Sequence, residues 1–170
     1  MSLENAKSLD ETGWRLLQEL RRNARLSYAE LGRRVALSLP AVTERVRRME
    51  EAGIITGYQA EVDLAQLGVP VLAIVHLRGI GGQSCRQAVD RVMEIPEALE
   101  CYRVTGDDSI IVKVVATSLD HLARVIDQLS LSGVPSTSIV RSKPMKRHVI
   151  PHEILERGED EEESPPQQFA

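Results

Sequence analysis

The stretch SLPAVTERVRRMEEAG, residues 38–53, decides the fold of the N-terminal part of this chain. Its apolar residues recur at i, i+4 and i+7, which is the spacing of a helix with one buried face. The inward stripe consists of Val42, Val46 and Met49. Ser38 can cap the helix, Pro40 falls in its first turn, and Gly53 can supply the left-handed residue that ends it. The stretch therefore predicts one amphipathic helix with a defined start and end.

Arg45, Arg47 and Arg48 are left on the outer side of this helix, where they either form an ordinary solvated surface or face a polyanion. The formal net charge of −4 is unevenly distributed. Residues 153–170 hold seven acidic residues against one arginine, and without them the net charge becomes +2. Residues 15–48 hold nine arginines against three glutamates. Because guanidinium groups pair well with phosphate, this basic segment favours a polyanionic partner.

Two more helices are predicted before the stretch. Asp10 or Thr12 can cap the first helix, and Ser27 followed by Glu30 is a capping-box pattern at the start of the second. The inward residues are Trp14, Leu16, Leu17 and Leu20 in the first helix, then Leu31 and Val35 in the second. Three short helices, the last two about one turn apart, match a helix-turn-helix. Residues 54–62 read as short extended segments that form a wing or a hinge.

In a helix-turn-helix, the N-terminal part of the last helix can enter the major groove of DNA. Side chains at that end can reach base edges, and arginines further along can hold phosphates. The candidates for base edges are Leu39, Pro40, Thr43 and Glu44. The complete predicted DNA-binding set is Ser27, Tyr28, Ser38, Leu39, Pro40, Thr43, Glu44, Arg45, Arg47 and Arg48.

After residue 69 the pattern changes to short apolar strands that alternate with helices. Strands are predicted over 71–78, 99–105, 110–116 and 137–143. Ser84 and Ser118 can cap the two helices between them. The inward sets of these helices are Cys85, Ala88, Val89, Val92 and Ile95, then Leu119, Leu122, Ala123, Ile126 and Leu129. The order βαββαβ predicts a ferredoxin-like domain, and the fold class is α+β.

The strands of this second domain are apolar on both faces, as the run VLAIV at residues 71–75 illustrates. Right-handed crossovers place both helices on the same face of the sheet. The other face would then be a large exposed apolar patch. We therefore expect a second subunit to cover it, so that the protein is at least a homodimer and presents two recognition helices to two DNA half-sites.

Several other classes of protein are disfavoured. The first ten residues, MSLENAKSLD, lack the apolar core of a signal peptide, and the longest apolar run, VPVLAIV, is too short to span a bilayer. Neither the two cysteines, Cys85 and Cys101, nor the four histidines have the spacing of a metal or redox site. We expect a reduced cytoplasmic protein without metal or cofactor. The acidic segment 153–170 is predicted to be disordered.

These residues together resemble the Lrp/AsnC family, the leucine-responsive and asparagine-responsive regulators. The resemblance covers residues 9–151 and rests on LDETGWRLLQELRRNARLSYAELGRRVALS, VTERVRRMEEAGIITGYQAEVD, ALECYRVTGDDSIIVKV and STSIVRS. It implies a winged helix-turn-helix, a hinge, and a sandwich domain that dimerises and often builds larger discs, such as an octamer. A small effector, commonly an amino acid, is expected at subunit interfaces. The expected segments are 1–56 for DNA binding, 57–69 for a linker strand, 70–152 for effector binding and oligomerisation, and 153–170 for the tail.

The resemblance also implies an effector site. Residues 38–48 match the recognition helix of the family, residues 105–108 match its effector loop, and residues 136–138 match the segment that often closes the pocket. An amino acid needs acceptors for its ammonium group, such as Asp107 or Asp108, and donors for its carboxylate, such as Thr137 and backbone N–H groups. The predicted effector set is Tyr102, Thr105, Gly106, Asp107, Asp108, Ser136, Thr137 and Ser138. Without the resemblance, Gly-Asp in the loop is only a hairpin turn.

The chain departs from the family pattern at three places. Asp108 and Ser109 stand where many members have an aromatic residue and then Asp, which predicts a more polar pocket. Ala36 stands where glycine is usual in the turn of the DNA-binding motif, and Gly13 stands where the family usually has Asp.

The leading hypothesis is a transcriptional regulator that binds double-stranded DNA and senses a small effector. One alternative is a tetrapyrrole decarboxylase, an enzyme class that resembles this family. The sequence has no paired acid–base constellation to support it, so we expect no enzyme. A second alternative is an architectural DNA-binding protein in which the effector loop is only a turn.

Overall fold

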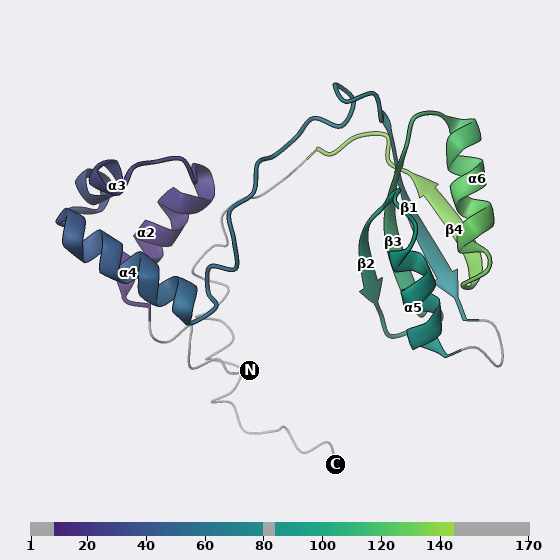
Figure 1. Cartoon of the computed structure of the whole chain (residues 1–170), viewed down its shortest axis with the longest axis horizontal. Coiled ribbons are helices and arrows are strands. Elements are labelled where there is room, and N and C mark those ends of the chain that lie inside the picture. The colour runs from purple at the N-terminus through teal and green to yellow at the C-terminus, as the bar shows by residue number, and fades with distance from the viewer. Residues whose placement is uncertain (1–8, 80–83, 145–170) are drawn as a thin grey trace, which may run out of the picture. The chain divides into compact units, whose positions relative to one another are not determined.

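The computed structural model describes residues 9–79 and 84–144, which form five helices and four strands (Figure 1). In chain order these are α2 (Glu11–Arg22), α3 (Tyr28–Val35), α4 (Leu39–Glu51), β1 (Val71–Arg78), α5 (Cys85–Met93), β2 (Ala98–Arg103), β3 (Ile110–Ala116), α6 (Leu119–Leu129) and β4 (Val134–Ile139). The helical unit and the sheet unit separate between Ala60 and Glu61, inside the segment predicted as a linker. The predicted disordered tail, residues 153–170, lies outside the described residues, as do His148 and His152.

The three N-terminal helices begin close to the predicted residues. The Asp10 carboxylate caps α2 by accepting a hydrogen bond from the Gly13 N–H at 2.7 Å. Ser27 Oγ caps α3 by accepting from the Glu30 N–H at 3.2 Å. Ser38 is the N-cap residue of α4, but its side chain makes no capping bond. That hydroxyl is exposed and available to a partner molecule.

One apolar cluster holds these helices together. Its buried members are Leu16, Leu20, Leu31, Val35, Val42, Val46 and Met49. Trp14, predicted to point inward, is only partly buried, and Gly13 takes the inward position instead. A Cβ atom at Gly13 would lie 3.0 Å from Leu9 Cδ2 and 3.6 Å from Met49 Cε. The glycine is therefore part of the packing between α2 and α4, which the helical periodicity alone did not indicate.

The turn between α3 and α4 is tight. Ala36 adopts the left-handed conformation, with φ 58° and ψ 44°, where the family pattern has glycine. The Leu37 N–H donates to the Gly32 carbonyl at 2.9 Å. A Cβ atom at Gly32 would come within 2.5 Å of the Leu37 carbonyl oxygen, so this turn requires glycine at position 32.

The segment after α4 differs from the sequence prediction. Gly53 has φ 69° and ends the helix as expected. Residues 54–70 are all described and contain no β-strand, so the predicted linker strand is absent. An extended segment forms a strand only when a neighbouring strand accepts and donates its backbone hydrogen bonds, and this segment has no such neighbour in the described chain.

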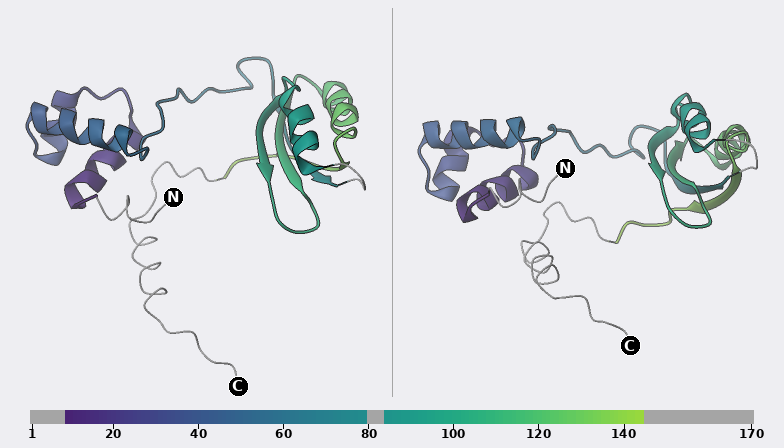
Figure 2. Two further views of the ribbon diagram at one scale, coloured as in Figure 1. Left: turned by 60° about the horizontal axis from the view of Figure 1, so that its bottom comes forward. Right: turned by 90° about the horizontal axis from the view of Figure 1, so that it is seen from below.

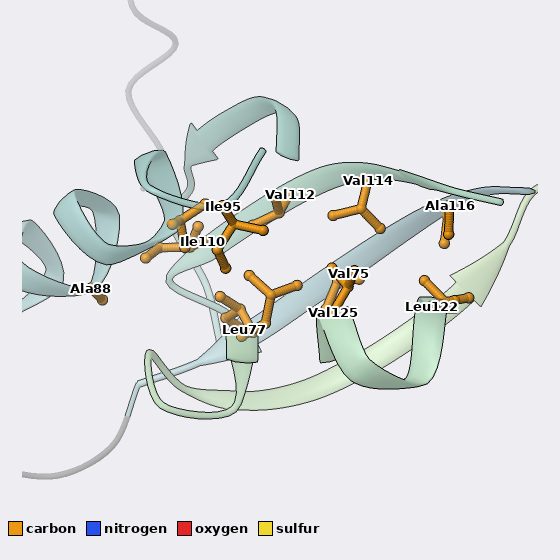
Figure 3. Close-up of a cluster of buried hydrophobic side chains, with 13 residues drawn as sticks. Val75, Leu77, Ala88, Ile95, Ile110, Val112, Val114, Ala116, Leu122 and Val125 are labelled. Carbon is orange, nitrogen blue, oxygen red and sulfur yellow. The ribbon is translucent and has the colours of Figure 1, made fainter. Parts of the chain in front are cut away.

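The C-terminal unit is a four-stranded antiparallel sheet in the order β2-β3-β1-β4, which confirms the ferredoxin-like prediction. Figures 1 and 2 show α5 and α6 on one face of this sheet. Between helices and sheet lies the core, part of which Figure 3 shows. Its buried residues are Ala73, Val75, Leu77, Ala88, Val92, Ile95, Ile110, Val112, Val114, Ala116, Leu122, Val125 and Leu129.

Two predictions for this unit were wrong: the bounds of the last strand and the residues on the buried face of the last helix. Strand β4 is Val134–Ile139 rather than 137–143. It starts early because Gly133 packs on β1, where a Cβ atom would lie 2.7 Å from the Arg78 carbonyl oxygen. In α6 the sheet-facing stripe is Leu122, Val125 and Leu129, while Leu119 is 62 % exposed and Ala123 is exposed. The apolar set of α6 is wider than the stripe in contact, so its pattern does not fix which edge faces the sheet.

The second face of the sheet, called the open face below, is not covered by α5 or α6. From the strand register it carries Leu72, Ile74, His76, Glu100, Tyr102, Ile111, Lys113, Val115, Ser136 and Ser138. It is less apolar than the sequence suggests, since Glu100 pairs with Lys113 across β2 and β3. The row that runs Tyr102, Ile111, His76, Ser136 crosses all four strands.

Candidate functional site

The N-terminal end of α4 presents an unusual exposed surface. Ser38, Leu39 and Pro40 are all exposed, and the apolar Leu39 side chain is 53 % accessible. Thr43 Oγ1 donates to the Leu39 carbonyl at 2.9 Å and lies on the same exposed side. These four predicted DNA-binding residues therefore gather at the helix end that a groove can admit.

Glu44 connects two of the predicted phosphate ligands. Its carboxylate accepts from Arg47 Nη2 at 2.8 Å and Nε at 2.9 Å, and from Arg48 Nε at 2.8 Å. Arg47 also pairs with Glu51. Hydrogen bonds from Arg47 and Arg48 lower the pKa of Glu44 to about 2, so this carboxylate is ionised at neutral pH. The two arginines are held by carboxylates that a phosphate group could replace.

Arg45 is placed differently from the other two arginines of α4. Its Nη1 and Nη2 atoms donate to the Asp10 carboxylate at 2.7 and 2.8 Å, joining α4 to the N-cap of α2. The hydrogen bond from Arg45, and next the one from the Gly13 N–H, lower the pKa of Asp10. A sequence signal existed for this position: Arg45 follows Val42 by three residues and precedes Met49 by four, so it borders the buried stripe.

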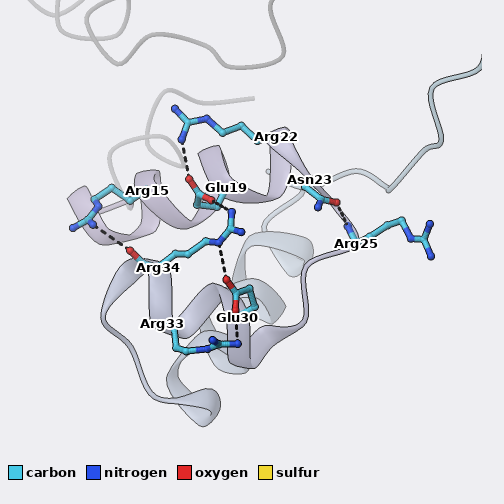
Figure 4. A network of polar contacts seen from close by, with 8 residues as sticks. All are labelled: Arg15, Glu19, Arg22, Asn23, Arg25, Glu30, Arg33 and Arg34. Atoms are coloured by element: carbon cyan, nitrogen blue, oxygen red, sulfur yellow. Dashed lines mark hydrogen bonds and ion pairs between the residues drawn. The ribbon is translucent and has the colours of Figure 1, made fainter.

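A second set of arginines surrounds Glu19 and Glu30, as Figure 4 shows. Glu19 accepts from Arg34 Nη1 and from Arg22 Nη1, each at 2.8 Å. The hydrogen bond from Arg34, the larger effect, and that from Arg22 lower the pKa of Glu19. Glu30 accepts from Arg34 Nε at 3.1 Å and pairs with Arg33, so it does not complete the predicted capping box with Ser27.

The DNA-binding set predicted from the sequence does not include the arginines of α2, of α3 and of the turn between them. Arg15 donates to the Arg34 carbonyl at 3.4 Å, which leaves much of its guanidinium accessible. The Arg25 guanidinium has no ion pair within the described residues and points away from the network in Figure 4. The excess of arginine between residues 15 and 48 was the available signal. Ser27 is exposed, and Tyr28 is partly buried against the helical core.

The predicted effector loop is fixed on the sheet by two backbone bonds. The Val104 N–H donates to the Ser109 carbonyl at 3.1 Å, and the Ser109 N–H donates to the Leu77 carbonyl at 3.0 Å. Gly106 has φ 117°, a conformation that side chains rarely adopt. Asp108 Oδ2 lies 3.0 Å from His76 Nδ1, which sequence reasoning did not include in the site.

The structure brings only part of the predicted effector set together. Asp108 and Ser136 adjoin His76 at one end of the open face, Tyr102 lies in the same row beyond Ile111, and Ser138 lies one row further along β4. Thr105, Gly106 and Asp107 are exposed in the adjoining loop. The Tyr102 hydroxyl donates to Glu100, which raises the pKa of Tyr102.

Thr137 is the exception in this set. It pairs with Val75 in the strand register and therefore lies on the helix-covered side of the sheet. Its side chain is on the opposite face from Ser136 and Ser138, so Thr137 is not placed to donate to a ligand on the open face.

The described part of the chain contains no group of three or more histidine, cysteine or acidic side chains arranged to hold a metal ion. Cys85 and Cys101 are free thiols packed against the sheet core, and burial raises the pKa of Cys101. None of the described helices combines the length and the apolarity that crossing a membrane requires.

Comparison with known proteins matches both units. A family model described as winged helix-turn-helix DNA-binding matches residues 9–56, and one described as Lrp/AsnC ligand binding domain matches residues 71–149. The chain is 35% identical over 135 residues to the HTH-type transcriptional regulator LrpC of Bacillus subtilis, covering 79% of this chain and 93% of that protein. It is 33% identical over 140 residues to the regulatory protein AsnC of Escherichia coli, covering 80% and 92%.

Solved structures agree with these matches. The B. subtilis LrpC structure has a TM-score of 0.78 at 34% identity and covers 82% of this chain and 99% of that one. A Neisseria meningitidis transcriptional regulator in complex with L-Met has a TM-score of 0.80 at 26% identity, covering 87% and 99%. The E. coli AsnC structure has a TM-score of 0.74 at 32% identity, covering 81% and 95%.

Proposed function

The chain belongs to the Lrp/AsnC family of transcriptional regulators, and on this premise we propose which of its surfaces bind DNA, effector and a second copy. It is a DNA-binding transcriptional regulator with an N-terminal helix-turn-helix and a C-terminal ligand-binding domain. The proposal adds the residues of each site, an amino-acid effector bound at subunit interfaces, and action in the cytoplasm without enzymatic activity.

We assign base reading to the N-terminal part of α4. The support is the exposed cluster of Leu39, Pro40 and Thr43, together with the Ser38 hydroxyl, which makes no capping hydrogen bond. Apolar and methyl groups of this kind contact thymine methyl groups, and a glutamate such as Glu44 can accept a hydrogen bond from cytosine N4. We assign Ser27 and Tyr28, at the start of α3, to a phosphate contact, because the backbone N–H groups at the N-terminus of a helix attract anions.

We assign phosphate binding to Arg47 and Arg48, and the observation that carries this assignment is their pairing with Glu44 on an exposed helix face. Exposed pairs of this kind contribute little to stability and are readily exchanged for another anion. Arg45 we assign to the contact between α4 and α2, because both of its terminal nitrogens are bonded to Asp10.

The test is the salt dependence of DNA affinity in a protein in which Arg47 and Arg48 are both replaced by Ala. Each phosphate contact contributes about 0.9 to the slope of log K against log salt, so the slope should flatten by as much as about 1.8 for each recognition helix bound. The matched control is Arg86→Ala with Arg124→Ala, two exposed arginines of the C-terminal unit, which should leave the slope unchanged. An unchanged slope in the α4 variant would remove both residues from the interface.

Replacing Glu44 separates affinity from specificity. Glu44→Gln releases Arg47 and Arg48 from a carboxylate, so affinity for DNA of any sequence should rise about twofold to fivefold, the range of an exposed ion pair. Preference for the selected sequence should fall, because the acceptor for cytosine is weakened. Selection from random DNA followed by competition binding measures both, and a retained preference would assign Glu44 to charge pairing only.

We propose that the open face forms the homodimer interface and that dimers assemble further, as far as an octamer. Its support is the apolar group Leu72, Ile74 and Ile111, whose side chains share this face and remain partly exposed in the single chain. Ile111→Lys should give a folded monomer in sedimentation velocity experiments, whereas Leu119→Lys on the opposite layer should still form the dimer. A dimeric Ile111→Lys protein would place the interface elsewhere.

We propose that the loop at residues 105–108 binds an amino acid, with Tyr102, Ser136 and Ser138 beside it. The relative solved with L-Met supports this class of effector. A thermal-shift screen of the amino acids tests it, because a ligand of the native state raises stability by mass action. A DNA-compacting protein without effector would respond to none of them, and a tetrapyrrole decarboxylase would be coloured, would decarboxylate its ligand and would ignore DNA.

A further inference from the structure

His76 lies near the C-terminal end of β1, a central strand that pairs with both β3 and β4. It faces the open side, between Ile111 on β3 and Ser136 on β4. Its Nδ1 atom is 3.0 Å from Asp108 Oδ2, and both side chains are about one-third exposed, at 35 % and 33 %. The pair therefore joins the proposed effector loop to the open face, and in the single chain both side chains are partly exposed.

This pairing separates the roles of the two neighbouring carboxylates. Asp108 is occupied by His76, while Asp107 is exposed and has no hydrogen bond or ion pair within the described residues. A ligand ammonium that took Asp108 would have to displace the imidazole, whereas Asp107 accepts it without loss. Asp107 is thus the better acceptor for the ammonium group, and Asp108 stays with His76.

The chemistry of the pair follows from its geometry. An ionised carboxylate only accepts hydrogen bonds, so Nδ1–H of His76 donates to Asp108. In the neutral ring, Nε2 then carries a lone pair and accepts a hydrogen bond; in the charged ring it donates one. In both forms, the pair offers hydrogen-bonding groups to a ligand. A ligand with an aliphatic side chain would leave these groups unpaired, and leaving a partly buried polar group unpaired is unfavourable.

From this arrangement we infer that His76, together with Asp108, selects effector amino acids whose side chains form hydrogen bonds, such as carboxamides or guanidinium, over aliphatic ones. The inference rests on the proposed effector role of the loop. Ser136, across from His76 on β4, supplies a further hydroxyl to the same ligand side chain. A site that hydrogen-bonds its ligand rejects analogues without those groups more strongly than an apolar pocket rejects polar ones.

The chain offers a matched control for this pair. His121 Nε2 lies 3.0 Å from Glu97 Oε1, and these side chains are 22 % and 24 % exposed. The His121 pair lies near the end of β3, where the Glu97 carbonyl accepts a hydrogen bond from the Val115 N–H. Asp108 instead lies just before the start of β3. Both pairs join an imidazole to a carboxylate at similar burial, at opposite ends of one strand, and only one adjoins the effector loop. The His121 pair uses Nε2, and its Nδ1 contacts Thr117.

The experiment measures dissociation constants by calorimetry for L-Gln, L-Asn, L-Arg, L-Leu and L-Met with the full chain and three variants. The native protein should bind at least one polar amino acid about tenfold or more tightly than L-Leu and L-Met. His76→Leu should remove or reverse this ratio, and Asp108→Asn should reduce it. His121→Leu should leave it unchanged.

The ratio, rather than affinity alone, distinguishes selection from a structural role. If His76 only fixed the loop, His76→Leu would weaken binding of all amino acids by the same factor and leave the ratio unchanged, which would overturn the inference. A native protein that prefers L-Leu or L-Met would also overturn it while leaving the proposed effector function intact. No binding of any amino acid by a native protein that still binds DNA would overturn both.

Discussion

The two units of this molecule are each built around one apolar cluster, but their exposed surfaces differ in kind. The helical unit surrounds its core with arginines, most of which share a carboxylate such as Glu19, Glu30 or Glu44 with a second arginine. The sheet unit covers one face with helices and leaves Ile74, Ile111 and their neighbours on the other. The first surface is suited to exchanging one anion for another, and the second to burial against protein.

This difference gives one short chain two surfaces with separate physical properties. Exposed ion pairs contribute little to the stability of the helical unit, so a phosphate can replace the carboxylate with little effect on the fold. Apolar side chains on the open face gain free energy only when another surface excludes water from them. Substitutions that destabilise one unit and spare the other test whether the two units unfold independently.

The largest effects are expected from a pair of glycines, one in each unit. A Cβ atom at Gly32 would meet the Leu37 carbonyl oxygen at 2.5 Å, and one at Gly133 would meet the Arg78 carbonyl oxygen at 2.7 Å. Backbone cannot move aside as a side chain can, so Gly32→Ala and Gly133→Ala should each destabilise their own unit by about 3 kcal/mol.

Trp14 is the single tryptophan of the chain and lies in the helical unit, so its fluorescence reports that unit alone during denaturant unfolding. Gly32→Ala should move the fluorescence transition to lower denaturant, and Gly133→Ala should leave it in place while lowering a second transition seen by circular dichroism. If both variants shifted one common transition equally, the two units would unfold as one cooperative unit and would not be independent.

A smaller effect is expected from the helix caps. Asp10→Ala removes the bond to the Gly13 N–H and the pair with Arg45, and Ser118→Ala removes the bond from the His121 N–H to Ser118 Oγ at 3.1 Å. Each should cost about 1 kcal/mol, the usual contribution of a cap. The exposed ion pair adds little to the first, and Asp10→Asn, which can still cap, should lose less.

Only the Asp10 cap should depend on pH. Because its pKa is lowered in the folded protein, Asp10 contributes stability that is present above the ordinary carboxyl pKa, about 4, and is lost as pH falls through the folded value. The Asp10→Ala and native proteins should therefore converge in stability below about pH 4, as measured by urea unfolding. The difference between Ser118→Ala and native should stay constant there, since a hydroxyl does not titrate.

The smallest effects concern two residues with positive φ. Ala36→Gly should stabilise the helical unit by about 1 kcal/mol, because alanine is strained in the left-handed region. Gly106→Ala should destabilise the sheet unit by about the same amount through backbone strain alone, since nothing lies within 4 Å of its Cβ position. Thermal unfolding of both variants measures these changes, and a destabilising Ala36→Gly would mean that the Ala36 methyl group makes a contact worth more than the strain.

The parts of this fold that local sequence specifies were predictable. The inward stripe of α4, its end at Gly53 and the bounds of β1 and β3 follow from spacing and caps that lie within a few residues of one another. The start of β4 depends on Gly133 meeting Leu77 and Arg78, more than fifty residues earlier in the chain, and the buried edge of α6 depends on the sheet against which it packs. Periodicity contains no information about such contacts.

In the candidate sites, too, features set by nearby residues were predictable and those set by distant contacts were not. The exposed start of α4 was predictable because outward positions follow from inward ones. The pairs Arg45 with Asp10 and His76 with Asp108 join residues 35 and 32 positions apart, and each changes the role that the sequence suggested for one member. Likewise Thr137 matched the family segment but lies on the covered face, because the register of β4 decides its side.

The carboxylate of Glu44, bonded to Arg47 and Arg48, also has a consequence for how the protein finds its target on a chromosome. If these arginines bind phosphate as proposed, every DNA phosphate must first displace this internal competitor, which shortens encounters that are held by phosphate contacts alone. Shorter dwell times at wrong positions allow more positions to be sampled per second by sliding and hopping. On this proposal, a single acidic side chain of α4 affects the speed of the search as well as the affinity of the final complex.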